Sequence, residues 1–403
     1  MALRESRIKT LLLSLVYPSR ASYYNDWRDA FTSHPAFDCT ELNILGLAPD
    51  VLARHLGAAD AIITLHSCNA DTLDYFATVA PVLGERRRGR LLSFVGNEYN
   101  SPYFSVPERT RLLGIARADV VATQLLQEAG AYLYGSIGAR VVAVPHALNP
   151  NAFKPGPAAG ARSIDIGVKG YRYPAFLGDD DRNRFLASLS AAGPEHGLKV
   201  DISEDKRLGR AEWADFLGQC RGTVSTEAGS WFIAPNDEFI GRIAAYLRER
   251  HTGLVISNDS WLRRAARHLP SPVKSLLWAV TKHGPVKFEV TNDNAVPFDE
   301  LYERFFRDTP RPSAYGKAIS SRHFDAIGTK TCQIMLRGRF NDILVANEHY
   351  IAVDPDHGNV ADALRRFNDV SQRRRITENA YELVLSGHTY AHRAAFVHRL
   401  LTE

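Results

Sequence analysis

Short apolar runs alternate with amphipathic stretches along residues 10–146. The predicted strands are TLLLSLV (10–16), DCTELNI (38–44), ADAIITLHS (59–67), GRLLSFVG (89–96), ADVVATQ (118–124) and ARVVAVPH (139–146). The predicted helices between them cover 22–33, 50–57, 70–82, 107–116 and 124–134. Strand and helix alternating at this spacing predict a parallel, doubly wound α/β sheet with helices on both faces.

The alternation stops at KPGPAAGAR (154–162), whose Pro, Gly and Ala content is typical of a linker, and then restarts. The later predicted strands are SIDIGVKG (163–170), LKVDIS (198–203), GTVSTE (222–227), TCQIMLRG (331–338) and HYIAVD (349–354), and the later helices cover 181–192, 210–219, 358–386 and 389–402. We therefore predict two Rossmann-like domains, 1–155 and 163–385, joined by one linker.

Composition agrees with a soluble two-domain protein and excludes several classes. The 403 residues are 45% hydrophobic and 23% charged, and no apolar run approaches the roughly 18 residues of a membrane span. A net charge of +4 gives little support for a nucleic-acid partner. The cysteines, expected to be reduced in a cytoplasmic protein because they lack metal-ligand or CxxC spacing, are Cys39, Cys68, Cys220 and Cys332.

Sequence motifs narrow the chemistry further. Neither GxGxxG nor a Walker loop is present, which argues against a dinucleotide-dependent dehydrogenase or a P-loop kinase. HxxH, DxD and clustered Asp and His residues are also missing from the sequence, so we expect no metal and no cofactor. Ligands of open parallel sheets bind at the carboxyl ends of the strands, so polar residues that follow predicted strands are the candidates for a site.

Two segments resemble group 1 glycosyltransferases of the GT-B fold. VVAVPHALNPNAFKPG (141–156) is similar to the end of their N-terminal domain, and SSRHFDAIGTKT (320–331) to their nucleotide-contacting helix start, R-x-F-E-A-x-x-x-G. The segment from 320 to 354 looks like a bacterial branch related to spore-maturation-type glycosyltransferases, and ADAIITLHS is similar to the first-domain strand that ends in His in that superfamily. The resemblance implies a C-terminal donor domain, an N-terminal acceptor domain and a C-terminal helix, 386–403, that returns to the first domain.

The chain departs from the family pattern at both acidic positions. Asp325 stands where the family has Glu, and Lys317 stands eight residues earlier, where a second Glu is usual. Glu227, at a strand end, is our candidate for that second acid. Residues 231–318 would then be a helical insertion in the donor domain.

The resemblance assigns the donor side to residues of the second domain. They are Lys169, Arg172, Gly229, Ser230, Arg322, Phe324 and Asp325. Lys169, Arg172 and Arg322 would bind the diphosphate, and Asp325 would accept hydrogen bonds from the ribose. Two alternatives stay open: Lys169 and Arg172 could form surface ion pairs, and Asp325 could serve only its helix dipole.

Residues at strand ends of the first domain are candidates for the acceptor side and for catalysis. The acceptor-side candidates are Tyr23, Tyr24, Asn97 and His146, and the catalytic candidates are Glu227, His66 and Glu98. A lone His is more often structural, and Glu227 could be a solvated acid in a turn. Glu98 would be a base only if the enzyme inverts.

We expect a metal-independent, retaining glycosyltransferase that moves a sugar from a nucleotide sugar to a glycan or lipid-linked acceptor of a bacterial surface glycoconjugate. Alternatives are a nucleotide-sugar epimerase or hydrolase of the same fold and an inactive sugar-nucleotide-binding protein. The expected location is the cytoplasm, with peripheral contact at the inner membrane face through basic amphipathic helices in 257–283. We assign no oligomeric state.

Overall fold

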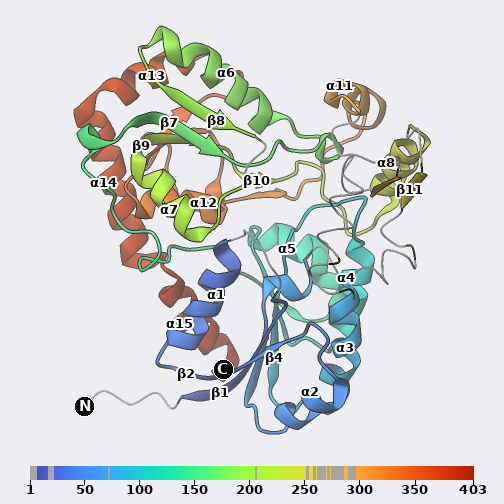
Figure 1. Ribbon diagram of the computed structural model, residues 1–403. Coiled ribbons are helices and arrows are strands. Elements are labelled where there is room, and N and C mark those ends of the chain that lie inside the picture. The colour runs from blue at the N-terminus through green and yellow to red at the C-terminus, as the bar shows by residue number, and fades with distance from the viewer. Residues whose placement is uncertain are drawn as a thin grey trace, which may run out of the picture.

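The computed structural model of the protein describes residues 7–16, 22–70, 73–204, 207–250 and 296–403, together with 254–256, 260, 269, 273 and 286–288. Two larger parallel sheets, each flanked by helices, form the lower and upper halves of the molecule in Figure 1. The predicted fold class, two doubly wound α/β domains, is confirmed.

The first sheet has the strand order β2-β1-β3-β4-β5-β6, and all its pairs are parallel. Its strands are β1 (Ile8–Ser14), β2 (Phe37–Asn43), β3 (Ala61–Thr64), β4 (Arg90–Phe94), β5 (Val120–Thr123) and β6 (Arg140–Ala143). Its helices are α1 (Ser22–Ser33), α2 (Pro49–Leu56), α3 (Asp74–Arg86), α4 (Val106–Ile115) and α5 (Gln127–Tyr134). Every residue of β3 and β5 is buried, which explains why these strands appear in the sequence as continuous apolar runs.

The second sheet has the order β15-β14-β9-β7-β8 and is also parallel. Its strands are β7 (Ile164–Lys169), β8 (Val200–Ser203), β9 (Cys220–Ser225), β14 (Cys332–Leu336) and β15 (Ile351–Val353). Its helices are α6 (Asp181–Glu195), α7 (Arg210–Gln219), α12 (Ser321–Gly328), α13 (Val360–Asn368) and α14 (Val370–Gly387). The single helix predicted over 358–386 is wrong, because extended Asp369 ends α13 and its carboxylate caps the first amides of α14.

The last helix, α15 (Tyr390–Thr402), packs on the first sheet beside α1, where Figure 1 shows its red ribbon next to blue segments. Tyr390 and Val397 belong to the same buried cluster as Leu12 and Phe31. The chain crosses between the sheets twice, and the crossings bond to each other: Leu148 N–H donates to His388 O, and Tyr390 N–H donates to Leu148 O, each at 2.9 Å.

The segment between β9 and α12 begins and ends in one place. Its flanking strands β10 (Ala228–Gly229) and β13 (Lys317–Ala318) pair antiparallel, so the two ends of the segment lie side by side. The described part contains α8 (Glu238–Glu249) and α11 (Phe298–Leu301), but also two paired parallel strands, β11 (Leu254–Ile256) and β12 (Val286–Phe288), where we expected only helices.

This segment also reaches the first domain. The side chain of Asn100 donates to Ala234 O and Asn236 O and accepts from Ala234 N–H, at 2.7–3.1 Å. The amphipathic helices expected in 257–283 lie outside the described residues, apart from 260, 269 and 273. Among the helices that are described, none combines the length and the apolar character needed to cross a bilayer.

Candidate functional site

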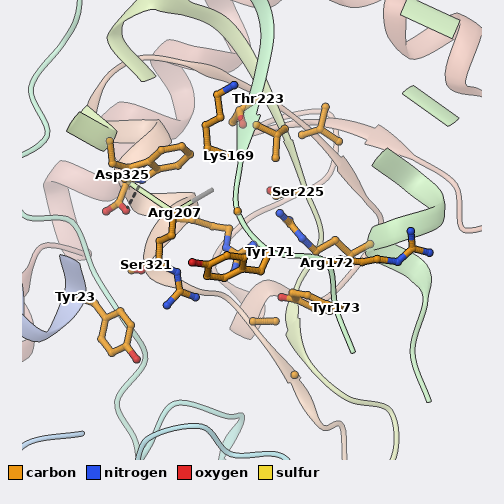
Figure 2. Close-up of a pocket in the computed structure, with 18 of the residues that line it drawn as sticks. Tyr23, Lys169, Tyr171, Arg172, Tyr173, Arg207, Thr223, Ser225, Ser321 and Asp325 are labelled. Atoms are coloured by element: carbon orange, nitrogen blue, oxygen red, sulfur yellow. Dashed lines mark hydrogen bonds between the residues drawn. The ribbon is translucent and has the colours of Figure 1, made fainter. Parts of the chain in front are cut away.

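A pocket of about 350 Å³ opens at the carboxyl ends of β7 and β9, between the two domains. Seven predicted site residues line it: Tyr23, Asn97, Lys169, Arg172, Gly229, Arg322 and Asp325. Figure 2 shows Lys169 and Asp325 on one side, Arg172 and Tyr173 on the other, and Tyr23 approaching from α1 of the first domain. Tertiary folding therefore brings together strand ends of the second domain, the start of α12 and residues of the first domain. The first group is Lys169, Arg172 and Gly229, the second is Arg322 and Asp325, and the third is Tyr23 and Asn97.

Lys169 is a cation whose charge is already compensated within the protein. Its Nζ lies 2.5 Å from a carboxylate oxygen of Asp201 and 2.9 Å from the hydroxyl of Ser203, both on the neighbouring strand β8. Lys169 therefore forms an ion pair, as the alternative interpretation of this residue expected. Arg172 lines the pocket and forms no ion pair with a carboxylate among the described residues, so it is the more available cation of the two.

Arg182, which the sequence analysis did not assign, is the most unusual residue of the pocket wall. It lies in the first turn of α6, is only 3% exposed, and has two buried donors, Nε and Nη1, without a hydrogen-bond partner among the described residues. Burial, together with the positive charge of Arg322, lowers the pKa of Arg182 to about 10. Buried charges normally have a partner, and among the described residues this guanidinium has the ring of Tyr173, with its centroid 5.4 Å away, but no carboxylate at ion-pair distance.

The start of α12 presents Arg322 and Asp325 to the pocket. Ser320 caps the helix by a reciprocal contact with His323, which fixes the direction of the first turn. The indole Nε1–H of Trp213 donates to Asp325 Oδ2 at 3.1 Å, the dashed line in Figure 2. Burial, with the nearby charge of Asp26, raises the pKa of Asp325 well above its usual value, against the opposing effects of Trp213 and Arg322.

Phe324 does not line the pocket. Its side chain is fully buried in a cluster with Leu148, Phe153 and Met335, where it fixes α12 on the sheet. Phe324 is thus a packing residue next to the site.

Glu227 lies behind the pocket wall. Its Oε1 accepts from Phe340 N–H at 2.7 Å and its Oε2 from the Tyr315 hydroxyl at 2.5 Å. Burial raises the pKa of Glu227 above its usual value. Both carboxylate oxygens are occupied by protein donors, and its role at a donor sugar stays a prediction.

Residues that follow Glu227 divide between the pocket and the core. Gly229 lines the pocket with φ at +109°, in a conformation that favours glycine. The hydroxyl of Ser230 instead donates to Leu177 O at 2.8 Å and is buried. Lys317, opposite Gly229, is buried and forms ion pairs with buried Asp179 and half-buried Asp181, each at 2.7 Å.

The two candidate histidines of the first domain lie behind the pocket. His66 and His146 are buried, with ring centroids 5.6 Å apart, and Tyr23, which lines the pocket, packs edge-on against both. Burial lowers the pKa of His146 to about 3 and that of His66 well below its usual value. Tyr24 lies against Tyr23, with ring centroids 4.4 Å apart, and is not part of the lining.

Glu98 is buried next to the pocket residue Asn97. Its carboxylate accepts from the hydroxyl of Thr123 and the N–H of Gln124, both at 2.6 Å, and burial raises its pKa to about 7. It therefore holds the start of the α5 segment, and its predicted role as a base stays untested.

Solved structures with a similar fold cover almost the whole chain. An alpha-glucosyltransferase in complex with UDP-glucose and DNA containing an abasic site has a TM-score of 0.53 and 12% identity, over 98% of this chain and 99% of that chain. The alpha-glucosyltransferase in complex with UDP and mismatched DNA has a TM-score of 0.51 and 10% identity, over 98% and 100%. HepE from Anabaena, with UDP and glucose, has a TM-score of 0.49 and 12% identity, also over 98% and 100%.

Part of the second domain matches a known family. Residues 301–399, which include α12 with Arg322 and Asp325, match a family described as glycosyl transferase-like. The chain has the fold of the GT-B glycosyltransferases. None of the curated proteins matches this chain.

Sequence reasoning missed the pocket residues Arg182, Arg207 and Trp213. Arg182 lies in DDDRNRF, which has the appearance of an ordinary charged helix start. The only signal was its position eight residues beyond the loop that follows the first strand of the second domain, and that position does not reveal burial.

Proposed function

We propose that this glycosyltransferase moves a sugar from a UDP-linked donor to a hydroxyl acceptor of a bacterial surface glycan or glycoconjugate, with retention of configuration and without a metal ion. The observation that carries the proposal is the buried guanidinium of Arg182 in the wall of the pocket, two of whose donors have no hydrogen-bond partner among the described residues, with Arg322 lining the same pocket. Two arginines that repel each other in a buried site are stabilised by a diphosphate, which supplies the opposite charge.

The same arginines would act during transfer. When the bond between the anomeric carbon and the diphosphate breaks, negative charge develops on the leaving phosphate oxygen, and fixed cations stabilise it without reorganising. Arg182, Arg322 and Arg172 lie where they could do this, which supports a cation supply from the protein itself. Asp325 would accept from a ribose hydroxyl, as the family resemblance implies.

The choice of UDP follows from the alpha-glucosyltransferase of similar fold, which binds UDP-glucose. Retention follows from the family resemblance. Occupation of both carboxylates, Glu98 and Glu227, by protein donors supports it, since neither is left free to activate an acceptor in this arrangement. Tyr23, Asn97 and Tyr99 would form the acceptor side.

Calorimetry with UDP, GDP, dTDP and CMP tests the nucleotide, and we expect UDP to bind most tightly. Incubation with UDP-sugars, with and without hydroxyl acceptors, then tests the reaction. Nucleotide-sugar turnover that needs no acceptor would favour an epimerase or hydrolase. UDP binding with neither transfer nor hydrolysis would favour an inactive binding protein. Flotation with anionic liposomes at low salt tests the proposed peripheral contact at the inner membrane face.

A further inference from the structure

The turn after β14 has an unusual backbone. Phe340, Asn341 and Asp342 follow one another with φ of +46°, +54° and +57°. Left-handed conformations are unfavourable for residues other than glycine, and three in succession are rare. Strain of this kind persists only where surrounding contacts hold it, so the contacts of this turn indicate its purpose.

On the second domain, the turn holds two parts of the donor side. Phe340 N–H donates to Glu227 Oε1, and a Cβ at Gly338 would lie 2.3 Å from Glu227 Oε2. The side-chain Oδ1 of Asn341 accepts from the N–H of Ile319 at 2.8 Å. Ile319 lies just before α12, the helix that presents Arg322 and Asp325.

On the first domain, the same turn contacts the segment that leads into α5. Asn341 Nδ2 donates to Gln124 O at 2.9 Å, and the N–H of Gln124 in turn donates to Glu98. Arg339 pairs with Glu128, in the first turn of α5, at 2.6 Å.

The oxygen and the nitrogen of the Asn341 side-chain amide therefore form hydrogen bonds to different domains. The orientation of the Asn341 amide follows from its partners, because a carbonyl can only accept and a backbone N–H can only donate. A carboxylate of the same shape would keep the bond from Ile319 and place an oxygen against Gln124 O. The interdomain contact can thus be removed without removing the contact to α12.

We propose that Asn341 is a positioning residue that couples the approach of the two domains to the placement of α12. The left-handed turn holds the amide where it can reach Gln124 O and Ile319 N–H together. That α12 binds the donor rests on the function proposed above. That Asn341 links Gln124 to Ile319 does not depend on that function.

Hydrogen–deuterium exchange of full-length Asn341→Asp and Asn341→Ala tests both contacts of Asn341, the one to Gln124 and the one to Ile319. Asn341→Asp should speed exchange about tenfold in 123–130 and leave 319–328 unchanged, since it removes only the bond to Gln124. Asn341→Ala should speed exchange in both segments. Asn347→Asp is the matched control: Asn347 also has a positive φ, +64°, and its Oδ1 accepts from Ala352 and Arg366 within the second domain.

UDP then tests the coupling itself. In the wild type, UDP should slow exchange in 123–130, which does not line the pocket, and in Asn341→Asp this effect should be lost while UDP affinity stays within about twofold. Wild-type exchange of 123–130 in Asn341→Asp would overturn the proposal, as would persistence of the UDP effect. If wild-type protein does not bind UDP, the proposed nucleotide is wrong, and exchange of the free variants still decides the role of Asn341.

Discussion

Replacing Arg182 with Gln removes a buried positive charge from the pocket wall, one that a bound diphosphate would complement. Two buried donors of Arg182 have no partner among the described residues. A charge-assisted hydrogen bond contributes about 1.5–3 kcal/mol, so losing the guanidinium should cost about 3 kcal/mol of UDP binding, roughly a hundredfold in Kd.

The stability of the free protein should not fall in the same variant. Burial and Arg322 lower the pKa of Arg182 to about 10, so the folded state disfavours this charge, and removing it should leave the melting temperature equal or higher. Loss of ligand binding without loss of stability distinguishes a binding residue from a structural one.

Isothermal calorimetry with UDP, together with thermal unfolding of the free variants, makes the measurement. Arg184→Gln is the control, because Arg184 lies on the same helix, is exposed and does not line the pocket. Uridine, which lacks phosphate, should compete equally in wild type and Arg182→Gln. A UDP affinity within about threefold of wild type, or an equal loss for uridine, would refute the assignment of Arg182 to the diphosphate.

Three further predictions concern buried groups near the site. Burial raises the pKa of Asp26 to about 6 from 3.8, so folding stability falls as pH rises through this range; Asp26→Asn should gain up to about 3 kcal/mol over wild type between pH 4 and 7, measured by denaturant unfolding. Lys317→Met leaves Asp179 and Asp181 without their cation and should lower the free energy of unfolding by about 3–5 kcal/mol. Lys330→Met removes a half-exposed ion pair and should lower it by less than about 1 kcal/mol. Gly338→Ala should displace the Glu227 carboxylate, lowering stability by about 1–3 kcal/mol and slowing transfer; unchanged values would contradict the contact.

Some elements were predictable because their cause is local. Parallel strands buried on both faces need continuous apolar runs, so β3 and β5 stand out in the sequence. The start of α12 was predictable from its motif, with Arg322 and Asp325 on the pocket side as expected. The break between α13 and α14 was not, because helical periodicity continues across it and only the capping contacts of Asp369 end the helix.

The sequence by itself determined the two sheets, the order of their strands along the chain and the helix that carries the donor motif, because hydrophobic period and capping depend on neighbours a few residues away. Tertiary structure alone decided which positive charges of the pocket are available to a ligand. Lys169 is neutralised because the β7–β8 register sets it opposite Ser203 with Asp201 close by. Arg182 lies in the pocket wall, where no carboxylate of the described residues forms an ion pair with it. Such partners come from elements distant in the chain, and burial, which gives a charge its energetic weight, exists only once those elements have packed.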